Sequence, residues 1–86
     1  MKDLEKIFKA LANRRRLAII KYLKNNKDAS VGEVSRAIKA SFKATSKHLL
    51  ILSSANIVDR EQVHFQAAYR LAPRVHPVLK VFLTLV

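Results

Sequence analysis

Hydrophobic residues recur at helical spacing through the first third of the chain. The repeat i, i+3, i+4, i+7 predicts an amphipathic helix over residues 2–12. Asn13 is a typical N-cap, and it predicts a second helix that ends near Asn25. The apolar stripe of the first helix is Leu4, Ile7, Phe8 and Leu11, and the inward-facing positions of the second helix are Leu17, Ile19, Ile20 and Leu23.

Two further helices follow a polar break at residues 25–28. Ser30 and Glu33 have the spacing of a capping box, and Val31, Val34 and Ile38 give this third helix a buried stripe. Ser41 predicts the start of a longer fourth helix that ends near Ala55. At 100° per residue its inward face carries Thr45, Leu49 and Leu52, and its outward face carries Lys43, Ser46, Lys47 and Leu50.

The hydrophobic period changes from helical to alternating after Asn56, a residue that often ends helices in the left-handed conformation. Phe65, Ala67, Tyr69 and Leu71 alternate at spacing two, which predicts a β-hairpin with its turn near Val63 and His64. Pro73 closes the hairpin, and Pro77 predicts the start of a last helix through Val86. The predicted order is α-α-α-α-β-β-α.

The third and fourth helices and their short connection have the pattern of a helix-turn-helix. The connection is Lys39, Ala40 and Ser41, and the fourth helix has a basic outer face. A hairpin directly after this recognition helix is the wing of a winged-helix domain. We therefore expect a mostly α fold with a β-hairpin wing, in one domain over residues 1–86 with its winged helix-turn-helix core at residues 13–72.

The composition excludes several classes of protein. The chain has no Cys, which excludes disulfide scaffolds, thiol redox sensing and thiolate metal sites. One Gly leaves no Gly-rich phosphate loop, and no residue pattern indicates an enzyme. No apolar run reaches the roughly 18–20 residues of a membrane-spanning helix, and the first residues lack the apolar core of a signal peptide. These features predict a cytoplasmic protein.

The excess of positive charge indicates a polyanionic partner. Seventeen Lys and Arg residues against six Asp and Glu give a formal net charge of +11, which favours nucleic acid over a membrane surface. Arg14, Arg15 and Arg16 stand in the first turn of their predicted helix, and Lys43 and Lys47 stand in the first two turns of theirs, where positive charge opposes the helix dipole. Phosphate oxygens at these helix starts would reverse that cost, although a solvated face is the alternative interpretation.

Three segments resemble the ArsR-type transcriptional repressors. Residues 11–23 read LANRRRLAIIKYL, like the family's second helix, and residues 31–58 follow its helix-turn-helix, VGEVSRAIKASFKATSKHLLILSSANIV. The closing YRL at residues 69–71 matches the last strand of the family's wing. The resemblance covers about Leu4 to Leu71 and needs no insertion between the pieces.

The resemblance implies a homodimeric repressor that binds double-stranded DNA and joins its subunits through residues 2–12 and 77–86. Phe42 replaces a usually polar residue, so it either meets a thymine methyl or packs inward. His64 stands where the family often has a turn glycine. The DNA-facing positions would be Arg14, Arg15, Phe42, Lys43, Ser46, Lys47, Arg60, Gln62, His64 and Gln66. We expect the dimer interface at Leu4, Phe8, Val78, Leu79, Phe82 and Leu83.

The metal sites of the family have no counterpart in this sequence. Its C-V-C motif corresponds to Ser30, Val31 and Gly32, and the last helix offers only His76 as a ligand. His48 lies beside the buried face of the recognition helix and is interpreted as a packing residue. We expect no metal and no cofactor, and the sequence leaves a small-molecule effector open.

Three alternatives remain open at the level of sequence. The last segment is apolar almost all round, which predicts burial against a second copy. A membrane-peripheral anchor is disfavoured because the segment lacks the basic face of such helices. A winged-helix module for protein or RNA and a non-specific architectural DNA-binding protein are the other two alternatives.

Overall fold

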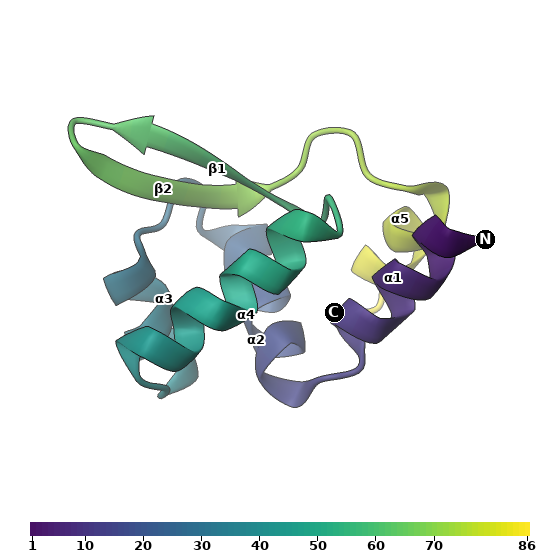
Figure 1. Ribbon diagram of the computed structural model, residues 1–86, viewed down its shortest axis with the longest axis horizontal. Helices are drawn as coiled ribbons and strands as arrows, with labels where there is room; N and C mark the ends of the chain where they lie inside the picture. Colours follow the sequence, from purple (N-terminus) through teal and green to yellow (C-terminus); the bar gives the residue numbers. More distant parts are fainter.

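The computed structural model describes all residues, Met1–Val86, as five helices and one two-stranded antiparallel sheet (Figure 1). The order of elements predicted from the sequence is confirmed, and so is the winged helix-turn-helix fold. The elements are α1 (Lys2–Leu11), α2 (Arg14–Asn25), α3 (Val31–Ile38), α4 (Phe42–Ser54), β1 (Val58–Val63), β2 (Gln66–Leu71) and α5 (Pro77–Leu83).

Side-chain caps begin the three helices of the core, as predicted. Asn13 Oδ1 accepts hydrogen bonds from the backbone N–H groups of Arg15 and Arg16, at 3.0 and 3.1 Å. Ser30 and Glu33 form the reciprocal capping box of α3, and these bonds from Ser30 lower the pKa of the Glu33 carboxyl below 4.5. Ser41 Oγ accepts from the backbone N–H of Ala44 at 3.0 Å and so begins α4.

Left-handed residues end the two helices of the helix-turn-helix. Lys39 follows α3 with φ 55°, and Asn56 lies two residues beyond α4 with φ 59°. A left-handed residue lets the chain leave a helix sharply while its amide still bonds to the last turn. These two reversals set α4 across α3 and direct β1 back along α4.

The hydrophobic core lies where α2, α3, α4 and the hairpin meet. Ile19 and Ile20 of α2 and the predicted inward face of α4 are completely buried. α2 contacts α1, α3, α4 and β2, so it is the central helix of the fold. The full cluster is Ile7, Ala10, Ile19, Ile20, Leu23, Ala29, Val34, Leu49, Leu52, Ala55, Ile57, Val58, Tyr69 and Leu79.

The hairpin has a two-residue turn, and its position corrects one prediction. Val63 pairs with Gln66, which leaves His64 and Phe65 as the turn at φ 49° and 67°. Phe65 was expected in the alternating strand, but it is 98% exposed at the tip. Phe65 was assigned to the strand because it extends the alternating apolar pattern of Ala67, Tyr69 and Leu71. The pairing of Val63 with Gln66 sets the start of β2 at Gln66 instead. Ala29 forms an isolated antiparallel β-bridge beside the hairpin, because it exchanges backbone hydrogen bonds with Tyr69.

The last helix is shorter than predicted. α5 ends at Leu83, and the amides of Thr84 and Leu85 bond three residues back in a tightened turn. Lys24 Nζ donates to the carbonyl oxygens of Leu83 and Val86, at 2.8 and 3.0 Å, and ties this end to α2. No helix of the chain is long and apolar enough to cross a bilayer.

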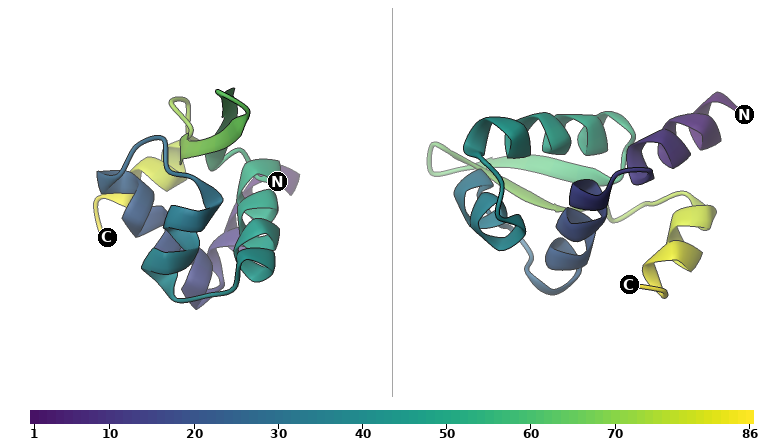
Figure 2. Two further views of the ribbon diagram at one scale, coloured as in Figure 1. Left: turned by 90° about the vertical axis from the view of Figure 1, so that its left-hand side faces the viewer. Right: turned by 90° about the horizontal axis from the view of Figure 1, so that it is seen from below.

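The two terminal helices lie at one end of the elongated molecule, and the hairpin tip and the start of α4 lie at the other. This division is clear along the long axis in Figure 1 and in the view from below in Figure 2. The arrangement separates the surfaces predicted for DNA contact from those predicted for dimerisation.

We predict that Thr45→Val stabilises the fold. Thr45 is completely buried, and its hydroxyl has no hydrogen-bond partner. An unsatisfied buried polar group costs about 1–3 kcal/mol, so a methyl group in its place should raise the free energy of unfolding by about 1 kcal/mol. Urea denaturation measures the change. Thr45→Ala, which also leaves a void, should lower stability, and a loss of stability in Thr45→Val would contradict the prediction.

Candidate nucleic-acid interface

The outward face of α4 carries two free cations. Lys43 and Lys47 are exposed, and Ser46 is half-buried between them. Positions i, i+3 and i+4 adjoin on one helix face, so these three side chains form a continuous polar strip. No acidic group lies within ion-pair distance of either lysine. Both ammonium groups are therefore available to a phosphate or to a base edge.

Phe42 begins α4 and is 64% exposed. The inward-packing alternative for Phe42 is therefore wrong. Its ring lines a shallow hollow of about 340 Å³ together with Val31, Gly32 and Ala67, between the start of α3 and the hairpin. The ring thus lies beside the strip formed by Lys43, Ser46 and Lys47.

Arg14 and Arg15 lie at the start of α2, close to the turn that leads into α4. Both side chains are exposed, and Arg15 Nη1 donates to the backbone carbonyl of Lys39 at 3.2 Å. This bond crosses from one helix start to the helix-turn-helix connection. Since neither α2 nor α4 contains an acidic residue, this part of the surface carries uncompensated positive charge.

The sequence analysis treated Arg16 only as a first-turn cation and missed that its side chain joins three elements. Its Nε donates to the Ala10 carbonyl at 2.6 Å and its Nη2 to the Lys9 carbonyl at 3.2 Å, at the end of α1. Its Nη1 lies 3.3 Å from His48 Nδ1 on α4. No local signal separates Arg16 from its two arginine neighbours, because its partner on α4 lies 32 residues away.

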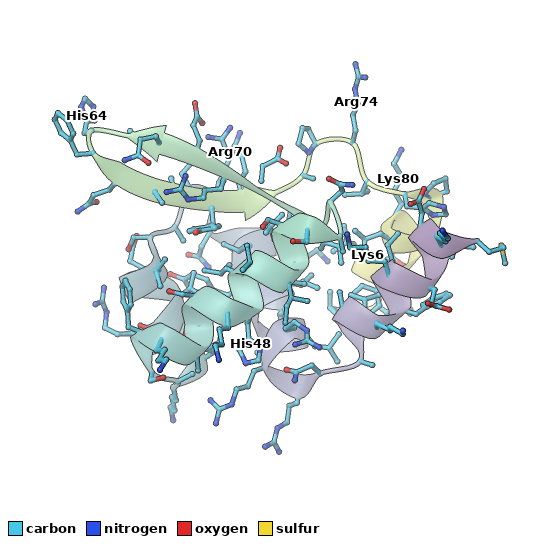
Figure 3. The ribbon with its side chains drawn as sticks, in the orientation of Figure 1. Lys6, His48, His64, Arg70, Arg74 and Lys80 are labelled. Carbon is cyan, nitrogen blue, oxygen red and sulfur yellow. The ribbon has the colours of Figure 1, made fainter.

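The contact between Arg16 and His48 defines the protonation state of His48. A guanidinium only donates hydrogen bonds, so Nδ1 accepts and the proton of the neutral ring lies on Nε2. Burial, and then the charges of Arg16 and Arg15, lower the pKa of His48 below 6.5. The half-buried ring, which Figure 3 shows at the lower edge of α4, therefore packs as expected and also accepts a hydrogen bond.

The hairpin separates the predicted wing residues into two faces. Residues directly opposite in an antiparallel pair share a face, so Arg60 and Gln62 lie on the face of Tyr69 and Ala67. Gln66 lies on the other face. Arg60 Nη2 donates to Gln62 Oε1 at 3.3 Å, and both side chains are exposed. The structure therefore brings together Arg60 and Gln62 but not Gln66.

Arg70 holds the base of the wing, a role that sequence reasoning did not assign. It forms ion pairs with Asp28, at 2.7 Å from Nε to Oδ1, and with Glu61 on the neighbouring strand. Figure 3 shows Arg70 on the outer face of the hairpin. Two of the six acidic residues are thus used to fix the wing, which leaves Arg60 unpaired with any carboxylate.

The residues predicted for dimerisation form an apolar surface, with one correction. Phe8 is 53% exposed, and Leu4, Val78, Phe82 and Leu83 are half-buried. Leu79, in contrast, is 1% exposed because its side chain fills the core of its own chain. It has no surface to offer a partner, so the prediction for Leu79 is wrong.

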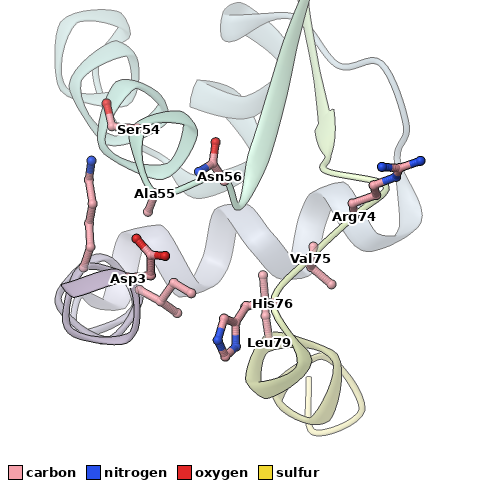
Figure 4. A pocket seen from close by; sticks show the side chains of 10 residues that line it. Asp3, Ser54, Ala55, Asn56, Arg74, Val75, His76 and Leu79 are labelled. Atoms are coloured by element: carbon pink, nitrogen blue, oxygen red, sulfur yellow. The ribbon is translucent and has the colours of Figure 1, made fainter. Parts of the chain in front are cut away.

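A cavity of about 360 Å³ lies between α1, the end of α4 and the segment that enters α5 (Figure 4). Asp3, Lys6 and Arg74 surround it, and His76 caps α5 by accepting the Val78 amide through Nδ1 at 3.2 Å. No three His, Asp or Glu side chains anywhere in the chain are close enough to hold a metal ion. The cavity is remote from the basic strip of α4.

A short helix, a sharp turn, a helix with a basic outer face and an adjoining hairpin define the winged helix-turn-helix class of DNA-binding proteins. Residues 13–60, more than half of the chain, match the model of the arsR family of bacterial regulatory proteins. The chain therefore belongs to the ArsR family, and its fold is that of transcriptional regulators rather than of enzymes. A sequence search of curated proteins finds no match.

Solved structures agree with this assignment. The homodimeric winged helix-turn-helix DNA-binding domain of Mb0332 from Mycobacterium bovis is 26% identical, with a TM-score of 0.84, over 98% of this chain and 75% of that one. HlyU from Vibrio cholerae, in its reduced form, is 31% identical, with a TM-score of 0.81, over 98% and 84%. NolR from Sinorhizobium fredii is 25% identical, with a TM-score of 0.80, over 98% and 81%.

We predict that acidification destabilises the fold through His48. Because its pKa in the folded chain lies below 6.5, the unfolded chain takes up the proton first. The free energy of unfolding should therefore fall as pH drops from 6.5 through the lowered pKa, and this contribution should be constant above 6.5.

Urea denaturation at several values between about pH 5 and 7.5 tests this. His48→Gln keeps an acceptor for Arg16 but does not titrate, so it should lose this part of the pH dependence. His64 and His76 are present in both proteins and serve as an internal control. An identical pH profile for the two proteins would contradict the assignment.

Proposed function

We propose that this protein is a dimeric transcriptional repressor that reads a near-palindromic operator through α4. The observation that carries the proposal is the exposed basic strip of α4, which has no acidic partner and lies beside a wing. The opposite face of α4 is buried in the core and fixes the position of the strip. The negative charge of a duplex is continuous along its backbone, so a protein that presents free cations in this shape gains affinity by releasing counterions. Such a regulator would act in the cytoplasm, where bacterial DNA lies.

The α4 strip would enter the major groove. Lys43 and Lys47 would donate to phosphate oxygens or to guanine O6 and N7, and Ser46 to a phosphate or a base edge. The exposed ring of Phe42 fits contact with a thymine methyl. Arg14 and Arg15 would hold the flanking phosphates, which positions the protein without reading sequence.

The wing would contact the adjoining groove or backbone. Arg60, Gln62 and His64 are exposed, and the one side-chain hydrogen bond among them joins Arg60 to Gln62 on the surface. Gln66 would approach DNA only from the opposite face of the hairpin, so it would contact a different strand or groove edge from Arg60 and Gln62.

A second copy would cover the apolar surface of the terminal helices. The exposed or half-buried residues Leu4, Phe8, Val78, Phe82 and Leu83 support this, as does Val81 at 64% exposure. Half-sites one turn of DNA apart would require the two recognition helices of such a dimer to lie about 34 Å apart. Two copies at +11 each make +22, so affinity should fall steeply with salt.

We predict that Lys47→Ala weakens binding to the DNA upstream of the protein's own gene by about 1–3 kcal/mol. Fluorescence anisotropy at two salt concentrations would compare this duplex with a pool of random duplexes. Lys80→Ala is the matched control, because it removes the same charge from α5 at the opposite end (Figure 3). The control should bind like wild type.

The remaining outcomes separate the alternatives. A greater loss for the upstream duplex than for the pool supports base reading by Lys47. An equal loss for both would reduce α4 to a phosphate clamp and favour an architectural role. If wild type binds neither duplex at low salt, the proposal fails. Binding of protein or RNA by the winged-helix domain is then the better hypothesis.

We predict that Phe8→Glu converts a dimer into a monomer. A carboxylate there would be buried without a partner in the proposed interface, at a cost of several kcal/mol. Analytical ultracentrifugation measures the mass directly. Phe42→Glu changes another exposed aromatic residue, 64% exposed against 53% for Phe8, at the other end of the molecule and should leave the dimer intact. An unchanged mass for Phe8→Glu would place the dimer contact elsewhere.

A further inference from the structure

Phe65 is a large aromatic residue in an unusual position, at the exposed tip of the hairpin. It is 98% exposed at the tip of the hairpin, so its ring gains no burial within the protein. It also holds a left-handed backbone, with φ 67°, next to His64 at φ 49°. A two-residue hairpin turn with positive φ at both positions strongly prefers Asn-Gly, and a large aromatic residue is strained there. Strained residues of this kind concentrate at functional sites.

The position of Phe65 connects this anomaly with DNA. The hairpin tip extends beyond the body at the same end as the start of α4, in both Figure 1 and Figure 2. Arg70 anchors the hairpin to Asp28 and also pairs with Glu61 across the two strands, and Ala29 pairs with the second strand. These contacts fix the hairpin, and with it the position of the Phe65 ring, relative to the rest of the protein.

The surroundings of the ring favour a nucleic acid over a protein or lipid partner. The residues around Phe65 at the tip are Gln62, His64 and Gln66, all polar and exposed, with only Val63 partly exposed as an apolar neighbour. An apolar partner would need a contiguous apolar patch of several hundred Å², which one ring and one valine, 40% exposed, do not provide. A protruding apolar ring among polar side chains is instead the arrangement of residues that insert between base steps from the minor groove.

We propose that Phe65 is a DNA-wedging residue, which enters the minor groove beside the α4 site, partly unstacks a base step and bends the duplex. The inference rests on the proposed function, since it needs α4 bound in the adjoining major groove. Pyrimidine–purine steps unstack most readily, so the wing would favour TA or CA at that position without any hydrogen bond to the bases. The wing would thus add specificity through deformability.

Phe65→Gly tests the inference because it should move two properties in opposite directions. Glycine adopts the left-handed turn without strain, so the variant should melt at a higher temperature than wild type. It has no ring, so its affinity for the upstream duplex should fall about tenfold and the duplex should straighten by about 20° or more. A structural role for Phe65 would lower stability instead.

Four measurements on the whole chain are needed. Thermal unfolding reports the turn, anisotropy reports affinity, and energy transfer between dyes at the two ends of the upstream duplex reports the bend. A 2-aminopurine base placed at successive TA or CA steps reports unstacking. Phe65→Trp keeps a flat apolar ring and should retain both the bend and the 2-aminopurine signal.

The outcomes distinguish the inference from the function on which it rests. If wild type binds the duplex and Phe65→Gly binds and bends it equally, the wedge is refuted while the DNA-binding proposal stands. A bend and a base signal lost in Phe65→Gly and kept in Phe65→Trp support the wedge. If wild type does not bind the duplex, both proposals fail.

Discussion

Leu49 and Leu52 bury their side chains completely and hold α4 against α2, α3 and β1. Full burial of such a side chain stabilises a fold by about 1.5–3 kcal/mol. A lysine in the first turn of a helix costs only about 0.3–1 kcal/mol against the helix dipole. The free energy gained by burying Leu49 and Leu52 therefore exceeds the cost of positive charge at the start of α4. The helix stays packed against the core while Lys43 and Lys47 remain exposed.

The distribution of acidic residues reinforces this arrangement. Asp28 and Glu61 pair with Arg70 at the base of the wing, and Glu33 completes the cap of α3. None of the acidic residues lies on α2 or α4. Three of the six acidic residues therefore stabilise the scaffold, and none of the six neutralises the exposed lysines of α4.

Arg16 gives the two ends of the molecule a direct physical connection. Its guanidinium binds the last carbonyl groups of α1 and the ring of His48 on α4. A shift of α1 relative to α4 would break charge-assisted hydrogen bonds, each of which contributes about 1.5–3 kcal/mol. In a dimer joined through α1, the angle between the recognition helices would therefore depend on this contact.

The sequence by itself determined the elements, because caps, hydrophobic period and turn residues act within a few positions. Asn13, Ser30 and Ser41 begin helices where local chemistry predicted, and the basic strip of α4 followed from helical geometry. Only the tertiary structure decided which residues meet across distance. Strand pairing places Phe65 at the hairpin tip and Gln66 on the face opposite to Arg60 and Gln62. Core packing buries Leu79, and the packing of α2 against α4 brings Arg16 into contact with His48. Such contacts depend on how whole elements pack, and no residue carries that information within its own neighbourhood.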